Sequence, residues 1–177
     1  MVGSGRHAPG ILMLAAGALL SCSGGGASVP DGGVSALDRD TAAIRSATRD
    51  FRSLDSAVAA GYPREVRRCL SDPEEGGMGY HHMNRALLDD TLELARPEIL
   101  LYSHTPEGEY RLNGVEYIVP YSVRPPDAEP PTIMDHELKR SAPLELWYLH
   151  AWVWTNNPSG LFADWNPRVE CPAAPAG

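Results

Sequence analysis

The chain has little positive charge and no basic stripe. Its 177 residues include 15 Lys and Arg against 23 Asp and Glu, so the formal net charge is -8. A protein that binds nucleic acid needs clustered Lys and Arg to neutralise the phosphates. The sequence therefore argues against a nucleic-acid partner and indicates an acidic surface.

Several catalytic motifs are also missing. The chain contains no C-x-x-C, H-x-x-x-H or H-x-H pair and no G-x-S-x-G serine motif. The glycine-rich stretch 77–84 lacks the Lys-Ser/Thr of a phosphate-binding loop, which argues against nucleotide binding. A chain of this length suits one domain. Any metal site must therefore be assembled from residues that lie far apart in the sequence.

The N-terminus contains a short apolar run rather than a membrane span. Residues 10–20 (GILMLAAGALL) form an apolar run of 11 residues that follows Arg6. This length suits the apolar part of a signal peptide and is too short to cross a bilayer. We therefore predict that residues 1–21 are a signal peptide. An ordinary secretory signal that is cleaved nearby is the alternative.

The sequence Leu19-Leu20-Ser21-Cys22 resembles the lipobox of bacterial lipoproteins. The resemblance implies acylation of Cys22 and anchoring of the exported protein to the bacterial cell envelope, with contact to the membrane through the lipid alone. Ser23, in place of Asp, implies the periplasmic side of the outer membrane in a host with two membranes. We predict a flexible tether over residues 22–34, one globular domain over 35–171 and a disordered tail over 172–177.

The other two cysteines form an even pair. With Cys22 acylated, Cys69 and Cys171 remain in an oxidising compartment, where disulfides form and persist. We predict a bridge between them, and two free thiols are the alternative. In the chain-entropy model such a bridge stabilises the fold by roughly 4–5 kcal/mol.

Apolar periodicity predicts an α+β fold. Residues 35–60 carry apolar side chains at helical spacing, with Ser35 as N-cap and Gly61 as the stop. Residues 98–104 and 109–121 predict a β-hairpin, whereas the glycines of 77–84 permit close backbone approach and favour a loop. We expect an N-terminal amphipathic helix packed on a small antiparallel sheet, with a curled half-barrel as one form of that sheet. The proline-rich stretch 122–143 predicts a lid or flap.

The stretch 144–171 contains all four tryptophans and His150. Strand alternation places Tyr148, His150, Trp152 and Trp154 on one face. Both faces are apolar, which is typical of a strand covered on both sides, so His150 needs a polar partner. Glu116 shares a strand face with Ile118. If that face is buried, the carboxylate needs a cation or a donor, and at a sheet edge it would face water instead.

Five motifs carry a family resemblance. They are GMGYH (77–81), PEILLY (97–102), GVEY (114–117), LHAWVW (149–154) and NPSGLFADWNP (157–167). Together they resemble a family of exported bacterial proteins of unknown function, over most of residues 53–171. The resemblance implies no activity. It implies that His81, Glu116 and His150 lie in shared motifs, whereas His136 matches only loosely.

Two histidines and a carboxylate are the minimal ligand set of a mononuclear metal site with open positions. We predict that His81, Glu116 and His150 bind one divalent transition metal (Zn, Fe, Mn or Cu), with His136 as a fourth ligand. Such a site would act on a small-molecule substrate. Two other readings stay open. Tyr80, Tyr148, Trp152 and Trp154 could line a pocket for a small organic or sugar-like ligand, or the His and Glu side chains could be structural hydrogen-bonding groups.

Overall fold

The computed structural model describes residues 1–3, 5, 34–63 and 68–172. Most of the predicted signal peptide, Cys22, most of the tether and most of the tail lie outside the described residues. The chain divides into two compact units, Met1–Gly33 and Val34–Gly177, and the second contains every helix and strand described below. Within the described residues, no helix is both long and apolar enough to cross a membrane.

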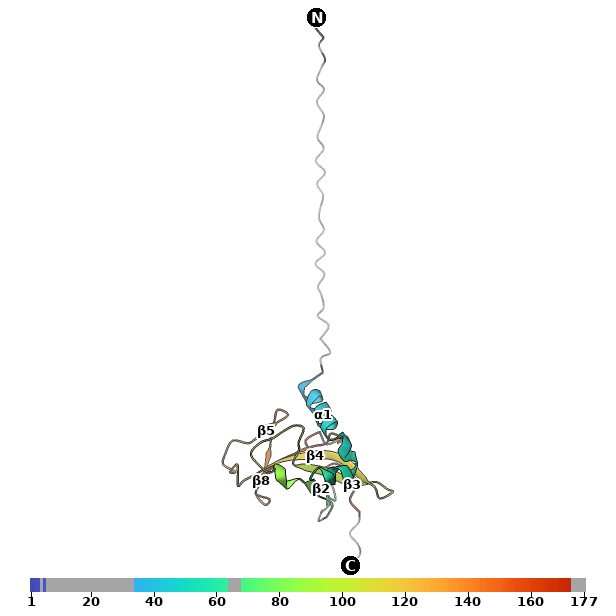
Figure 1. Cartoon of the computed structure of the whole chain (residues 1–177), viewed down its shortest axis with the longest axis vertical. Helices are drawn as coiled ribbons and strands as arrows, with labels where there is room; N and C mark the ends of the chain where they lie inside the picture. The colour runs from blue at the N-terminus through green and yellow to red at the C-terminus, as the bar shows by residue number, and fades with distance from the viewer. Residues whose placement is uncertain (4, 6–33, 64–67, 173–177) are drawn as a thin grey trace, which may run out of the picture. The chain divides into compact units, whose positions relative to one another are not determined.

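An antiparallel sheet forms the centre of the second unit (Figure 1). Six strands of the described chain lie in the order β1-β2-β3-β4-β8-β7, and every neighbouring pair is antiparallel. Their bounds are β1 (Leu70–Asp72), β2 (Gly76–Met83), β3 (Ile99–His104), β4 (Tyr110–Pro120), β7 (Lys139–Ser141) and β8 (Leu146–Ala151). The short strands β5 (Thr132–Ile133) and β6 (His136–Glu137) pair with each other. The predicted α+β class and the hairpin of β3 and β4 are confirmed.

The N-terminal helical region is broken rather than continuous. α1 (Ala36–Ala47), the 3-10 helix η1 (Arg49–Arg52) and α2 (Leu54–Ala59) replace the single predicted helix. Thr48 Oγ1 donates to the Ile44 carbonyl and accepts from Trp154 Nε1, which fixes the end of α1. Ser53 then caps α2 through its contact with the Ser56 N–H. Ser and Thr compete with helical hydrogen bonding in this way, and apolar spacing alone does not reveal it.

The two faces of the sheet differ in what covers them. One face packs against the helices, and its buried core includes Tyr102, Val115 and Tyr117 from the strands and Ile44 from α1. The residues that alternate with these point to the opposite face, where Ile99, Leu101 and Ile118 form a second apolar cluster. Glu116 and His150 share this second face, because they are directly opposed in β4 and β8.

Residues 77–84 form most of strand β2, so the predicted glycine-rich loop is wrong. The glycines are required by close backbone contact instead of a turn. Gly79 has φ +86°, and a Cβ there would lie 2.2 Å from the Tyr102 carbonyl oxygen. Only glycine fits such a position, because L side chains are strained at positive φ and this one would clash. The strand can therefore approach β3 and carry His81 onto the second face.

The proline-rich segment is part of the fold rather than a flap. It contains β5, β6 and β7, and β7 pairs with β8 at the sheet edge. Met134 and Leu138 are buried, as expected for residues that hold its middle. The Leu138 N–H donates to the Pro131 carbonyl, which closes the loop on itself. The segment therefore does not form the predicted lid over the site.

A disulfide joins Cys69, just before β1, to Cys171 near the end of the described chain. The two Cα atoms are 5.5 Å apart, within the ordinary range of disulfides. The two cysteines are 102 residues apart in the sequence, so the disulfide closes a loop that contains the whole sheet. This prediction is confirmed.

Candidate metal centre

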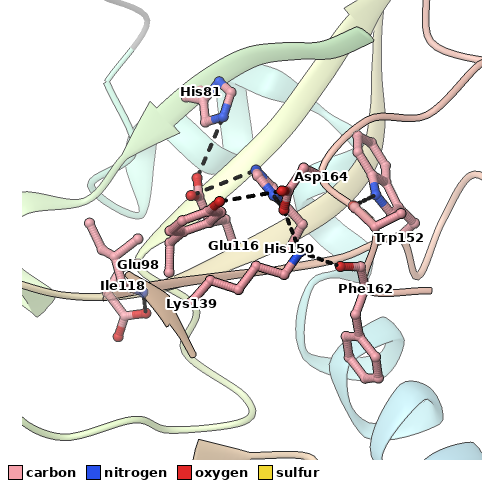
Figure 2. Close-up of polar contacts among 11 residues, drawn as sticks. His81, Glu98, Glu116, Ile118, Lys139, His150, Trp152, Phe162 and Asp164 are labelled. Carbon is pink, nitrogen blue, oxygen red and sulfur yellow. Dashed lines mark hydrogen bonds and ion pairs between the residues drawn. The ribbon is translucent and has the colours of Figure 1, made fainter. Parts of the chain in front are cut away.

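Strand register brings three side chains from three strands to one point. Glu116 of β4 pairs with His150 of β8. His81 of β2 pairs with Leu101 of β3, and β3 separates it from β4. Two strand spacings are about 10 Å, so His81 and Glu116 must both reach across β3 to meet. Figure 2 shows His81 and His150 approaching the Glu116 carboxylate from different sides.

The distances within this group suit a common ligand. His81 Nε2 lies 3.5 Å from Glu116 Oε2, and His150 Nε2 lies 3.6 Å from Glu116 Oε1. One ligand atom from each of the three residues lies within 4.8 Å of the others. Ligand atoms bonded to one zinc-sized ion at about 2.1 Å are roughly 3.0–3.4 Å apart. Side-chain rotations that move the ligand atoms by less than about 1.5 Å would therefore suffice to bind an ion.

Two members of the group are buried but poorly satisfied by hydrogen bonds, and His81 is half-buried. Glu116 is 6% exposed and His150 is 1% exposed. Among the described residues, Glu116 Oε2 and both ring nitrogens of His150 are buried without a hydrogen-bond partner. Native proteins rarely leave such atoms unsatisfied, because each costs about 1–3 kcal/mol. A structural hydrogen-bond cluster would satisfy these atoms, so the geometry disfavours that reading.

Burial keeps His81 in the protonation state that a ligand needs. Desolvation lowers the pKa of His81 below its ordinary value of 6.5, and the nearby His150 lowers it further. Glu116 opposes this effect but does not reverse it. The imidazole is therefore neutral at pH 7, with a nitrogen lone pair free to bind a cation.

Asp164 lies beside His150 on the other side of the ring. His150 Nδ1 lies 3.7 Å from Asp164 Oδ1, which also accepts a 2.6 Å hydrogen bond from Lys139 Nζ (Figure 2). Tyr148 OH contacts the other carboxylate oxygen at 3.3 Å. The His150 contact, followed by the Lys139 hydrogen bond, lowers the pKa of Asp164 to about 2. A carboxylate behind a histidine fixes its tautomer in many metal sites.

The segment that carries Asp164 is fixed by Trp152. The Trp152 ring stacks on His150 with 6.0 Å between ring centroids, and its Nε1 donates to the Ala163 carbonyl at 2.7 Å. Sequence reasoning did not single out Asp164 or Lys139. The signal for Asp164 was its place in the FADWNP motif, where one carboxylate stands among aromatic residues. Nothing in the sequence marks Lys139.

A cavity of about 940 Å³ opens on the group. Its lining includes His81, Glu116 and His150, together with apolar side chains from β1, β2, β3 and β8. This volume falls in the range of small-molecule sites. Of the four predicted pocket residues, Tyr148 lines the cavity and Trp152 is buried beneath His150. Tyr80 and Trp154 pack against the helix-covered core and do not line it.

His136 does not join the group. It lies on β6, where it is exposed, and its Nδ1 is 2.9 Å from the Met134 carbonyl oxygen. Its ring contacts Phe162, with 4.0 Å between ring centroids. The prediction of a fourth ligand is therefore not confirmed. Met134 and Asp135, both at positive φ, form the turn between β5 and β6, and β6 pairs with β5 rather than with the sheet that carries the other three residues.

Glu98 is a second buried carboxyl group that the sequence did not reveal. It precedes β3 and is 1% exposed, and it accepts a hydrogen bond from the Ile118 N–H at 3.1 Å. Desolvation raises the pKa of Glu98 to about 8, above the ordinary value of 4.5. Glu98 therefore holds a proton at neutral pH and is not an anionic ligand.

This pKa predicts a pH-dependent effect of Glu98→Gln on stability. Between pH 4.5 and 8 the folded protein binds this proton and the unfolded chain does not, so the contribution of Glu98 to stability falls as pH rises. Gln is neutral and can still accept from Ile118. The free energy of unfolding of the variant, relative to that of the parent, should therefore rise by roughly 3 kcal/mol as the pH is raised from 4.5 to 7. Urea unfolding at each pH measures this difference. The exposed Glu137→Gln is the control, and a pH-independent difference for Glu98→Gln would contradict the expectation.

Comparisons with protein-family models, with curated proteins and with solved structures found no match to this chain. The resemblance to an exported family stays a prediction from the motifs. The fold and the site nevertheless define a class, an antiparallel α+β domain with a His-Glu-His group on the sheet face opposite the helices. The function is inferred from that group and the cavity above it.

Proposed function

We propose that this protein binds one divalent transition metal ion through His81, Glu116 and His150. The observation that carries the proposal is that Glu116 Oε2 and His150 Nε2, which lie where the three side chains meet, are buried without a hydrogen-bond partner among the described residues. Coordination to a metal ion would satisfy these buried atoms and offset the free-energy cost of burying them. Both imidazoles and the carboxylate have lone pairs that can bind an ion in the same space. Two His and one carboxylate suit Zn, Fe, Mn or Cu, and the donor set does not choose among them.

The site would leave coordination positions open towards the cavity. Three protein ligands occupy fewer positions than a four- to six-coordinate metal provides. The remaining positions would face a space of about 940 Å³, which could hold a small-molecule ligand beside the metal. A bound metal would supply Lewis-acid activation of that ligand or of water. The chain's own groups would orient the site, with Asp164 fixing His150 and Lys139 holding Asp164.

We also propose that the domain is exported and anchored to the cell envelope by lipid at Cys22. The support is the apolar run followed by Ser21-Cys22 in the sequence, together with the Cys69–Cys171 disulfide, which suits an oxidising compartment. Mass spectrometry of the protein from its native membrane tests the anchor, and an unmodified N-terminus that excludes Cys22 would contradict it.

Elemental analysis tests the metal directly. Protein purified without a metal-affinity tag, then dialysed against each of Zn, Mn, Fe(II) and Cu, should retain about one ion per chain for at least one metal. The same metal should raise the urea midpoint, because an ion that binds only the folded state stabilises it. Substoichiometric metal after every supplement, with no midpoint shift, would contradict the proposal.

Cavity binding without metal is the second candidate function, favoured by the volume and apolar lining of the cavity. It predicts saturable ligand binding by protein stripped with a chelator. The two candidates differ in one measurement, because a metal-dependent site loses ligand affinity on stripping and a simple binding pocket does not.

A further inference from the structure

The cavity lining has a charge pattern opposite to that of the whole chain. The chain carries a formal charge of -8, yet Glu116 is the only acidic residue among those that line the cavity in the described structure. Two arginines, Arg68 and Arg85, line it as well. Since Glu116 belongs to the proposed ligand set, the remaining charge presented to a ligand is positive. Bound metal would add to this positive field.

The other walls of the cavity are apolar. Half of its lining residues have apolar side chains, namely Pro63, Leu70, Met78, Met83, Ile99, Leu144 and Leu146. Leu144 is 69% exposed, an unusual position for a leucine at the mouth of a cavity. Such walls favour a ligand with a hydrocarbon or aryl body, because burial of apolar surface contributes about 25 cal/mol per Å². A strongly polar ligand such as a sugar would leave these walls unused.

The two arginines lie on the side of the cavity formed by β2. Arg85 begins the 3-10 helix η2 (Arg85–Leu87), four residues beyond His81 and so at most about 13 Å from it along the chain. Arg68 stands two residues before Leu70, whose Cα partner in β2 is Gly79, so the antiparallel direction carries it alongside the His81 end of β2. Both are exposed, and neither forms an ion pair with another described residue in the structure. Their guanidinium groups are therefore available to a ligand.

We infer that the cavity binds an amphipathic organic oxyanion, whose charged head pairs with Arg68 and Arg85 and whose apolar body lies along Met83, Ile99 and Leu146. The inference rests on the proposed function, since it names the class of ligand that would lie beside the metal. Guanidinium groups match the planar geometry of a carboxylate and also bind phosphate esters in bidentate fashion. Amines are repelled by the same field, and alcohols lack the charge that the arginines recognise.

Calorimetric titration with four probes of equal chain length tests the head group. Octanoate, octyl phosphate, octanol and octylammonium are titrated into the chain from Ser23 onward, which keeps the whole unit Val34–Gly177 and needs no detergent. Octanoate or octyl phosphate should saturate one site, and octanol and octylammonium should bind at least about tenfold more weakly. The ratio between the two anions distinguishes a carboxylate ligand from a phosphate ester. Equal affinity for octanol and both anions would overturn the inference.

Arginine variants test which groups hold the anion. Arg68→Gln and Arg85→Gln should each weaken the preferred anion about tenfold, with the octanol affinity unchanged. Arg111→Gln, an exposed position on β4 that does not line the cavity, is the matched control. Unchanged anion affinity in the Arg68→Gln, Arg85→Gln double variant would overturn the inference, because the anion would then be held elsewhere.

Metal content measured on the same samples separates this inference from the proposed function. The arginine variants should retain as much metal as the parent, since neither residue belongs to the His81–Glu116–His150 group. Arginine-dependent anion binding in protein that takes up no metal would support the anion site and contradict the metal site. Normal metal uptake with arginine-independent anion binding would overturn the anion site and leave the metal site standing.

Discussion

Replacing Glu116 with glutamine is expected to weaken metal binding by at least about 100-fold without unfolding the protein. Glutamine has nearly the same shape, so strands β4 and β8 should keep their packing around it. It removes the single anionic ligand that lies between His81 and His150. Changes in residues that only orient a metal ligand cost 10–100-fold in affinity, so losing this ligand should cost at least about 100-fold.

Urea unfolding with and without metal measures this loss as a free energy. At a metal concentration 100 times the dissociation constant, metal should raise the free energy of unfolding of the parent by about 2.7 kcal/mol. A variant that binds 100-fold more weakly should gain only about 0.4 kcal/mol under the same conditions. Elemental analysis of both proteins gives the stoichiometry independently.

The metal-free protein provides a second test, because there the effect of Glu116→Gln on the free energy of unfolding should have the opposite sign. In metal-free protein Glu116 is a buried carboxylate with one oxygen that makes no hydrogen bond among the described residues. Glutamine removes that charge, so the metal-free variant should be at least as stable as the metal-free parent. His136→Gln is the matched control, since His136 is exposed and away from the group. Equal stabilisation of the parent and Glu116→Gln by metal would show that the ion binds elsewhere.

The meeting of His81, Glu116 and His150 could be predicted in part from the sequence. Alternation in β4 placed Glu116 on a face with Ile118, and the apolar residues around His150 indicated a strand covered on both sides. Burial of a carboxylate and an imidazole in one domain requires a partner for each, which favours a shared site. What alternation cannot supply is register. The pairing of Glu116 with His150 depends on where the β4 and β8 strands meet, which no local pattern encodes.

The errors also have identifiable causes. The close backbone approach predicted for Gly77 and Gly79 is confirmed, but the two glycines lie in strand β2 and not in the predicted loop. Trp154 was placed on the His150 face by strand alternation, but β8 ends at Ala151 and the indole donates to Thr48 on the helix side. Both cases turn on long-range contacts. Asp164 was missed for the same reason, because only the folded chain brings it beside His150.

Reduction of the Cys69–Cys171 disulfide is expected to cause the largest loss of stability. The bridge spans 102 residues, and the chain-entropy model assigns about 4.7 kcal/mol to a closed loop of roughly this length. Domains of this kind have only about 5–15 kcal/mol of net stability, so reduction should remove a large share of it. Urea unfolding of oxidised and reduced protein measures the difference.

The loss should be local as well as global, because the bridge fastens the C-terminal segment next to β1. Cys171 Sγ contacts the Leu70 carbonyl at 3.2 Å, and the C-terminal segment is otherwise held to β2 by the Gly77 and Asn166 backbone pair. Leu70 also lines the cavity, so reduction should weaken the binding of any cavity ligand. Cys69→Ser with Cys171→Ser is the control, since its stability should equal that of the reduced parent and should not respond to reductant. If the double variant unfolds at the same urea concentration as the oxidised parent, the closed loop contributes nothing and the sheet alone holds the fold.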